Sequence, residues 1–329
     1  MDSLFSNRNS SNNDVLLLLD GSYCCYFCAY SAVSRWRSQY YETGLETIRL
    51  PEPGSIPYDE LPDLVNDTIH FKRVLFDVAV EKLEIINNIV LETTGHFFSN
   101  ATDENHVDTI LARDSHAQGQ FRRVLYPEYK MQRAAARAES NDFNHWKIFE
   151  YIYDVVFPQI LPHNNTYSIK IPEAEGDDII AAAVKSEKLK QKYHQVILIA
   201  SDHDFCQLHR PENRIRQFTL KGEQVECTFQ ITRSGQKQIL KITPDQALMI
   251  KIITGDSSDN IPGIKKRLGP VGAWKLLTEG DAKENLRKLF AEDKDAALAF
   301  QRNRKLIDFN EIPQDVQDII IAAIMKNVG

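Results

Sequence analysis

Acidic side chains occur in this chain where short apolar runs stop and where helices are expected to begin. The residues at these positions are Asp20, Asp114, Glu175, Asp177, Asp178, Asp202, Asp204, Asp256 and Asp259. Carboxylates gathered in one cleft cannot all stay ionised without divalent cations, because each desolvated pair of like charges raises the pKa values of its members. Oxygen ligands of this kind suit Mg²⁺ or Mn²⁺ and disfavour zinc. Two such ions about 4 Å apart can activate water and stabilise the leaving oxygen in phosphodiester hydrolysis.

The strand expected to hold the centre of this site covers residues 196–200. This apolar run is too short for a helix of its own and too apolar for a strand with one solvated face, which predicts a central parallel strand covered on both sides. Ligands bind beyond the carboxyl ends of such strands, and Asp202 and Asp204 lie there. An aspartate after a strand is equally often only a turn former or a helix cap.

Two other segments, 14–22 and 106–115, repeat the pattern of an apolar run that ends on an acid. Each predicts a strand, and the acids that follow are Asp20 and Asp114. Gly21 permits a tight turn from the first strand into a helix.

Residues 171–184 place acids at the start of an apolar helix. Acids in a first turn complement the helix dipole, which accounts for one or two of them but not for the four between 173 and 178. On a helix Glu175 and Asp178 share a face, so their charges lie close together unless a cation or a proton intervenes.

The segments between these acids are expected to be mainly loops and helices. The proline-rich stretch 38–66 predicts an irregular loop or insertion, and amphipathic helices are expected at about 71–91 and 141–157. Alternating residues at 213–243 predict a β-ribbon on the sheet edge, with turns at 221–222 and 234–235. Thr243 and Pro244 then open the helical remainder of the chain.

Basic residues follow two of the acids. The segment 122–137 interleaves arginines and lysine with tyrosines, a pattern that suits a nucleic-acid strand, although a plain exposed basic helix is the alternative. The segment 255–277 runs from two acids into a basic turn punctuated by glycine and proline, whose amides and lysines suit a phosphate backbone. The residues predicted to contact nucleic acid are Arg122, Arg123, Tyr129, Arg137, Lys265, Lys266, Arg267 and Lys275.

The composition predicts a globular protein. It is 43% apolar and 26% charged, and its net charge of -7 argues only weakly against nucleic acid, because affinity for phosphates follows local basic patches. The apolar run at 15–19 is too short to span a membrane, and residues 1–13 are polar and lack the basic region of a secretory signal. We therefore expect a flexible leader at 1–13, no membrane association and a cytoplasmic location, in the host cytoplasm if the protein is viral.

The chain has five cysteines. Cys25 and Cys28 have CxxC spacing, but no second Cys/His pair lies at zinc spacing from them. Buried reduced thiols are therefore favoured over metal or redox sites.

Five motifs match, in order, those of the flap endonuclease/5′-nuclease family. They are DGS at 20–22, YPEYKMQR at 126–133, EGDD at 175–178, SDHDFCQL at 201–208 and GDSSDNIPG at 255–263. The resemblance runs from about residue 14 to 318. It implies an α/β fold with a mixed, mainly parallel central sheet flanked by helices, as in PIN-like cores, a helical arch, and a C-terminal helix–three-turn–helix region. The expected domains are a nuclease core at 14–243, with the arch at 115–160 and the ribbon at 213–243, and a duplex-binding region at 244–329.

The resemblance also implies an activity and its partners. The expected enzyme is a structure-specific 5′ nuclease with 5′→3′ exonuclease, flap endonuclease and ribonuclease H activity, which removes RNA primers or 5′ flaps in DNA replication. It would use two Mg²⁺ ions, for which Mn²⁺ can substitute. Its expected partners are branched or nicked duplex DNA, RNA/DNA hybrid, a single-strand-binding protein or other replication proteins, and it would act as a monomer.

Site roles follow from the same resemblance. Lys130 and Arg133 would be the catalytic cations that engage the scissile phosphate, and Tyr129 would stack on a terminal base. The first metal and its surroundings would be held by Asp20, Asp114, Glu175, Asp177, Asp202 and Asp204. The second metal would lie nearer Asp178, Asp256 and Asp259.

Some features depart from the family pattern or leave other functions open. The hairpin of the family often surrounds a monovalent ion such as K⁺, but here Lys266 and Arg267 stand where the pattern has a single glycine, and Val271 where it usually has lysine. A PIN-type single-strand ribonuclease shares the acidic sheet edge but would lack the segment 255–277. A catalytically inactive DNA-binding scaffold would have lost an acid or Lys130, and none is missing.

Overall fold

The computed structural model describes residues 14–46, 63–95, 107–115, 119–133, 145–162, 165–233 and 236–328. Several expectations fall outside these residues: the leader at 1–13, most of the proline-rich insertion, Arg137, and the turn at 234–235. The described ends of the insertion form a π-helix at Arg37–Tyr41 and the short helix α2 (Leu64–Asp67).

The core is a five-stranded sheet, in which neighbouring strands follow the order β3-β2-β1-β4-β5. The strands are β1 (Val15–Asp20), β2 (Val107–Arg113), β3 (Thr166–Lys170), β4 (Gln195–Ile199) and β5 (Ile215–Phe218). The expected α/β fold with a mainly parallel central sheet is confirmed, and all four pairings among the described strands of this sheet are parallel rather than mixed. The carboxyl ends of all the strands therefore lie at the same edge.

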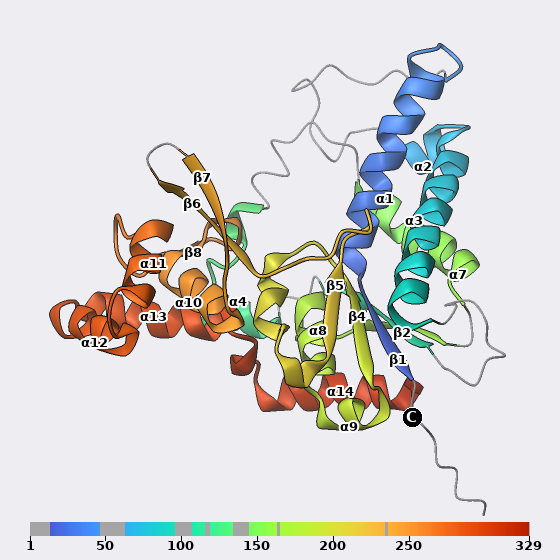
Figure 1. Cartoon of the computed structure of the whole chain (residues 1–329). Coiled ribbons are helices and arrows are strands. Elements are labelled where there is room, and N and C mark those ends of the chain that lie inside the picture. Colours follow the sequence, from blue (N-terminus) through green and yellow to red (C-terminus); the bar gives the residue numbers. More distant parts are fainter. Residues whose placement is uncertain are drawn as a thin grey trace, which may run out of the picture.

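Helices cover both faces of this sheet, as Figure 1 shows. One face packs against α1 (Gly21–Trp36), α3 (Phe71–Thr94), α6 (His145–Tyr151) and α7 (Phe157–Ile160). The other packs against α8 (Gly176–Lys185), α9 (Glu187–Lys192) and α14 (Gln314–Val328). Leu17 and Leu19 of β1 belong to the first apolar cluster, whereas Leu16 and Leu18 belong to the second. Burial on both sides explains why these strands read as continuous apolar runs rather than as alternating ones.

Three local expectations need correction. Residues 215–218 join the sheet as the parallel edge strand β5, because the 3₁₀-helices His203–Leu208 and Pro211–Asn213 cross back after β4. The antiparallel ribbon is confined to β6 (Thr228–Arg233) and β7 (Gln236–Lys241). The expected helix at 141–157 is divided, in its described part, into α6, a π-helical turn at Ile152–Val156, and α7.

The C-terminal part is helical, as predicted. It contains α10 (Pro244–Thr254), α11 (Pro270–Thr278), α12 (Ala282–Glu292), α13 (Lys294–Ile307) and, after the 3₁₀-turn Phe309–Glu311, α14. Thr243 caps α10 by accepting a hydrogen bond from Gln246, as expected. The short strands β8 (Gly255–Asp256) and β9 (Ile261–Pro262) flank a 3₁₀-turn between α10 and α11.

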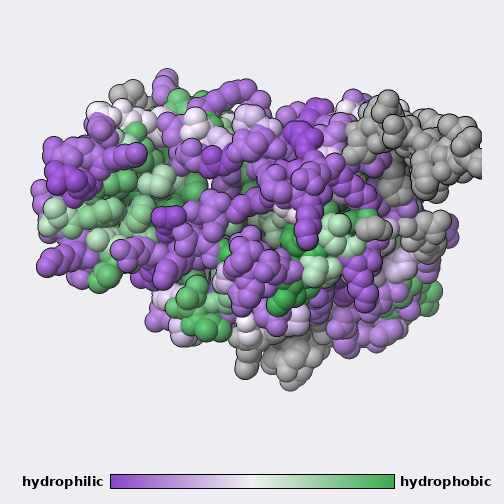
Figure 2. Space-filling view, turned by 90° about the horizontal axis from the view of Figure 1, so that it is seen from below, coloured by the Kyte–Doolittle hydropathy of each residue, from purple (hydrophilic) through white to green (hydrophobic). Residues whose placement is uncertain are grey.

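The surface seen from below is mostly hydrophilic, with apolar side chains in separate patches (Figure 2). None of the described helices combines the length and hydrophobicity needed to cross a lipid bilayer.

Candidate active site

The first acids of the site meet where β2, β1 and β4 end side by side. Asp20 is the last residue of β1 and also the N-cap of α1, where its carboxylate accepts a hydrogen bond from the Tyr23 N–H at 3.0 Å. The chain must turn sharply after it. A Cβ on Gly21 would lie 2.5 Å from the Ala112 carbonyl oxygen of β2, so only glycine fits at this strand-to-helix turn.

Asp114 links the starts of two helices. Its carboxylate accepts hydrogen bonds from Ser22 Oγ at 2.5 Å and from the Gly176 N–H at 2.7 Å. Asp177 lies in the first turn of α8, beside Gly176. Asp202, after β4, caps the 3₁₀-helix His203–Leu208 by accepting from the Asp204 N–H at 2.8 Å. We call Asp20, Asp114, Asp177 and Asp202 the first acidic group.

The carboxylates of the first acidic group repel one another. Burial, together with the charges of Asp114 and Asp202, raises the pKa of Asp20 to about 7. Burial and the same neighbours, with Asp20, raise the pKa of Asp177 well above its ordinary value, and Lys130 opposes this shift. Shifts of this size from crowded acids are typical of sites that bind cations or transfer protons.

Asp204 and Asp256 form a second acidic group, and Lys251 bridges them. Its Nζ forms ion pairs with Asp204 and, at 3.0 Å, with Asp256 Oδ2. Burial raises the pKa of Asp204 to about 6 despite Lys251. Burial also acts on Asp256, but Lys251 and hydrogen bonds from Ser258 leave its pKa below the ordinary value. Lys251 was missed by sequence reasoning, although a single lysine among the apolar residues of α10 is the signal that could have found it.

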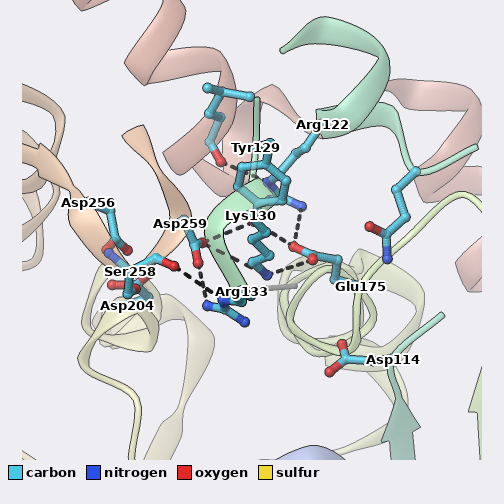
Figure 3. Close-up of polar contacts among 12 residues, drawn as sticks. Asp114, Arg122, Tyr129, Lys130, Arg133, Glu175, Asp204, Asp256, Ser258 and Asp259 are labelled. Atoms are coloured by element: carbon cyan, nitrogen blue, oxygen red, sulfur yellow. Dashed lines mark hydrogen bonds and ion pairs between the residues drawn. The ribbon is translucent and has the colours of Figure 1, made fainter. Parts of the chain in front are cut away.

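A third set of contacts surrounds Lys130, as Figure 3 shows. Lys130 Nζ lies 2.6 Å from Glu175 Oε1 and 3.8 Å from Asp259 Oδ2. Arg133 forms an ion pair with the other oxygen of Asp259. Burial opposes the ionisation of Glu175, but Lys130 and Arg122 lower its pKa to about 2. Glu175 therefore lies among cations, unlike the first acidic group.

The segment 126–133 is also joined to the loop 255–263 through its backbone. The Lys130 N–H donates to the Asp259 carbonyl at 2.9 Å, and Asn260 Nδ2 donates to the Glu128 carbonyl at 2.8 Å. Arg133 Nε donates to the Ser258 carbonyl at 3.2 Å. Lys130 itself has a φ of 56°, a left-handed conformation that is strained for a side chain of this kind.

Two predicted site residues are structural in this fold. Arg122 has only 5% of its side chain exposed, and its Nη1 lies 2.6 Å from Asp178 Oδ2 while its Nε donates to the Leu306 carbonyl at 2.7 Å. Asp178 is fully buried and also accepts from the Glu175 N–H at 3.0 Å, which completes a capping box. The nucleic-acid role expected of Arg122 and the metal role expected of Asp178 do not fit these positions, because each is the other's buried partner.

Tyr129 is also placed differently from its expected role. It is 3% exposed, and its hydroxyl donates to Glu175 Oε2 at 2.7 Å and lies 3.1 Å from Asp259 Oδ2. Its ring packs in an apolar cluster with residues of α10 and α13. A buried ring cannot stack on a base, so in this conformation Tyr129 positions the two acids instead.

The five remaining predicted nucleic-acid residues that the structure describes lie on the surface. Arg123 is exposed and lines a cavity of about 260 Å³. The lining of this cavity also includes Ser22, Asp114, Lys130, Arg133 and Glu175. The other four of these predicted residues lie before and within α11: Lys265, Lys266, Arg267 and Lys275. Arg267 has a φ of 67°, so the backbone is left-handed at the point where the family pattern has glycine.

The donors of the two acidic groups fit hard divalent cations. Every side chain in them offers carboxylate oxygens, the ligands that Mg²⁺ and Mn²⁺ prefer. The raised pKa values of Asp20, Asp177 and Asp204 show that ionised carboxylates are disfavoured there without added positive charge. Divalent ions supply that charge.

Comparisons with known proteins agree with this geometry. Residues 79–239 match the family of 5′-3′ exonuclease N-terminal resolvase-like domains. Ribonuclease H of Enterobacteria phage T4 is 26% identical over 253 residues, which cover 73% of this chain and 76% of that protein. Flap endonuclease Xni of Klebsiella pneumoniae is 32% identical over 121 residues, which cover 37% of this chain and 44% of Xni.

Solved structures show the same fold. The phage T5 5′-exonuclease with bound zinc ions superposes with a TM-score of 0.57 at 18% identity, covering 96% of this chain and all of that one. The T5 D15 flap endonuclease, in a pseudo-enzyme-product complex with DNA and metal ions, gives 0.52 at 17% identity, covering 95% and 98%. With its ordered motifs, its acidic sheet edge and these matches, the chain is similar to the 5′-nuclease family of 5′-3′ exonucleases and flap endonucleases.

Proposed function

We propose that this protein is a Mg²⁺-dependent, structure-specific 5′ nuclease that removes RNA primers or 5′ flaps during DNA replication. Its substrates would be flapped or nicked duplex DNA and RNA/DNA hybrid. The observation that carries the proposal is the meeting of acids from β1, β2, β4 and α8 beside a cavity lined by Arg123, Lys130 and Arg133. Carboxylates for metal ions and cations for phosphates are the two requirements of phosphodiester hydrolysis.

Each acidic group is suited to one part of the metal site. The first acidic group would hold one ion, and Asp204 with Asp256 would contribute to the second. Bound Mg²⁺ supplies an activated water and positive charge at the leaving oxygen. Without a metal ion, Lys251 neutralises Asp204 and Asp256. It would have to give up one of these ion pairs when the second metal ion binds.

The chain's own cations would hold the substrate. Lys130 is 14% exposed and pairs with Glu175, and a phosphate oxygen entering the cavity would take the place of that carboxylate. Arg133 is 43% exposed and can reach a phosphate while it still contacts Asp259. Positive charge fixed at the reacting phosphate stabilises the transition state without reorganisation.

The exposed cations before and within α11 would hold the duplex. Lys265, Lys266 and Arg267 lie in the turn that precedes this helix, and Lys275 lies within it. Lysine, arginine and backbone amides placed in this way can contact phosphates without reading bases. Such contacts suit an enzyme that selects a junction rather than a sequence.

The proposal is tested by a cleavage time course with four 5′-end-labelled substrates: a 5′-flapped duplex, a nicked duplex, an RNA/DNA hybrid and single-stranded RNA. In Mg²⁺ we expect cleavage of the first three and little of the last. Asp202→Asn keeps an N-cap oxygen for the Asp204 N–H but removes one charge, so it should abolish cleavage and leave flap binding within a few-fold. Undiminished turnover by Asp202→Asn would show that Asp202 has no role in the active site. Preferential cutting of single-stranded RNA would favour a PIN-type ribonuclease, and binding without cleavage would indicate an inactive scaffold.

A further inference from the structure

Two cysteines and a histidine lie together outside the acidic site. Cys206 Sγ, His209 Nδ1 and Cys227 Sγ all lie within 4.8 Å of one another. Cys206 and His209 come from the 3₁₀-helix His203–Leu208 and the residue that follows it, whereas Cys227 directly precedes β6. The nuclease mechanism uses none of these side chains.

The local backbone explains why these side chains meet. In a 3₁₀-helix, side chains three residues apart lie above one another. His203, Cys206 and His209 have this spacing, and Cys206 Sγ lies 3.9 Å from His203 Nδ1. Cys227 Sγ approaches the same face, 3.5 Å from His209 Nδ1.

Hydrogen bonds fix the tautomer of His209. The Gln217 side chain is fully buried, and its Nε2 donates to the Ala200 carbonyl at 3.0 Å and to the Asp202 carbonyl at 2.8 Å. With both N–H bonds used in this way, the Gln217 Oε1 can only accept. It lies 2.9 Å from His209 Nε2, which must therefore carry the proton. The Nδ1 of the neutral ring is left with a free lone pair, aimed at the two sulfurs.

The distances suit a tetrahedral metal. Zinc bonds of about 2.3 Å to sulfur and 2.0 Å to nitrogen place ligand atoms about 3.5 to 3.8 Å apart. The 3.5 Å between Cys227 Sγ and His209 Nδ1 already has this value, and the other members need to move by about 1 Å at most. Thiolates and a neutral imidazole with an unprotonated ring nitrogen are the forms of these side chains that bind zinc.

We propose that Cys206, His209 and Cys227 bind one Zn²⁺ ion, with His203 in position to supply the fourth ligand. Thiolate and imidazole together select zinc over the hard cations of the acidic site. The ion would fasten the start of β6 to the 3₁₀-helix that carries Asp202 and Asp204 at its beginning. Gln217 extends the connection, because it contacts both the ligand His209 and the backbone of Asp202. The site is therefore structural, and it would hold the acidic loop in place rather than take part in hydrolysis.

The test uses the full chain purified without chelators. We expect about one zinc per chain by elemental analysis, and replacement by Co²⁺ should give the intense sulfur-to-cobalt charge-transfer and tetrahedral ligand-field absorption of a thiolate site. Cys227→Ser, at a half-buried position where serine fits, should abolish the charge-transfer band. His203→Ala should weaken metal affinity by at least about ten-fold, in line with the loss of a ligand.

Two matched variants separate this site from the others. Cys28→Ala removes a buried thiol of α1 and should leave the band unchanged. Asp20→Asn alters the acidic site and should also leave the charge-transfer band unchanged. The zinc proposal can therefore hold even if the nuclease proposal fails. The proposal is overturned if the wild-type chain gives no charge-transfer band with equimolar Co²⁺. It is equally overturned if Cys227→Ser keeps the band, or if the intact mass shows a Cys206–Cys227 disulfide in place of metal.

Discussion

Replacing Asp20 by asparagine should stabilise the metal-free protein while it destroys the enzyme. Asparagine keeps an oxygen that can accept the Tyr23 N–H, so the cap of α1 survives. What changes is the charge. Wild-type Asp20 must ionise in a buried position and next to Asp114 and Asp202, and the substitution removes both the buried charge and the repulsion.

The size of the gain in free energy of unfolding, and the pH range in which it appears, follow from the pKa of Asp20, which rises from 3.8 to about 7 on folding. A raised folded-state pKa means that the folded protein holds this proton more tightly than the unfolded chain does. Stability is therefore lost as pH rises from about 4 to about 7, and the loss is constant above that. The full shift corresponds to about 4 kcal/mol, and because the residue is partly exposed and shares protons with its neighbours, we expect about 2 to 4 kcal/mol.

The assay is urea unfolding in EDTA at pH 5 and pH 8, followed by tryptophan fluorescence. Asp20→Asn should exceed the wild type in free energy of unfolding at pH 8, by an amount that shrinks towards pH 5. Added Mg²⁺ should stabilise the wild type more than the variant, because ligands bound only by the folded state stabilise it. Asp281→Asn is the control: it changes the charge of an exposed N-cap of α12 and should shift stability by less than about 0.5 kcal/mol. Equal or lower stability of Asp20→Asn at pH 8 without metal would refute the idea that the first acidic group is held together against its own repulsion.

Three other substitutions separate catalytic, structural and conformational roles. Lys130→Ala should slow single-turnover cleavage of a flap much more than it weakens binding, because Lys130 lies at the cavity among the acids; a pure loss of affinity would contradict this role. Arg122→Met should lower the free energy of unfolding by about 3 to 5 kcal/mol, since it leaves Asp178 buried without its cation, and the folded variant should bind DNA as the wild type does. Arg267→Gly should raise the free energy of unfolding by up to about 1 kcal/mol, because glycine adopts the left-handed φ of 67° without strain, and unchanged or reduced stability in urea would argue against strain there.

The sequence predicted the three strands that matter most because each is buried on both faces. β1, β2 and β4 appear as uninterrupted apolar runs, and the acids after them mark where the runs stop. β3 was missed because it is an edge strand in which only Ile169 is buried, so its pattern is mostly polar. β5 was assigned to the antiparallel ribbon because its few residues alternate like those that follow, and only tertiary pairing with β4 distinguishes them.

The active site was also predictable only in part. Which acids converge could be inferred, since parallel strands end at the same edge of a sheet. Which charges pair with one another could not. Arg122 looks like its exposed neighbour Arg123 in sequence, yet one side chain turns inward to Asp178 and the other faces solvent. The Cys206 and Cys227 thiols are too far apart in sequence to read as a pair, and the fold alone brings them together.

The seam between residues 126–133 and the loop 255–263 fixes the distance between two parts of the molecule. Hydrogen bonds from Lys130, Asn260 and Arg133 cross it, so the cavity wall and the turn that opens α11 cannot shift independently without breaking them. If a nucleic acid is bound at that turn, a fixed number of nucleotides would separate the bound phosphates from the phosphate that lies at the acidic groups. The seam would thus set the distance between the bound duplex and the cleavage site. Insertion of residues into the loop 255–263 should therefore move the position of cleavage along the substrate rather than abolish cleavage.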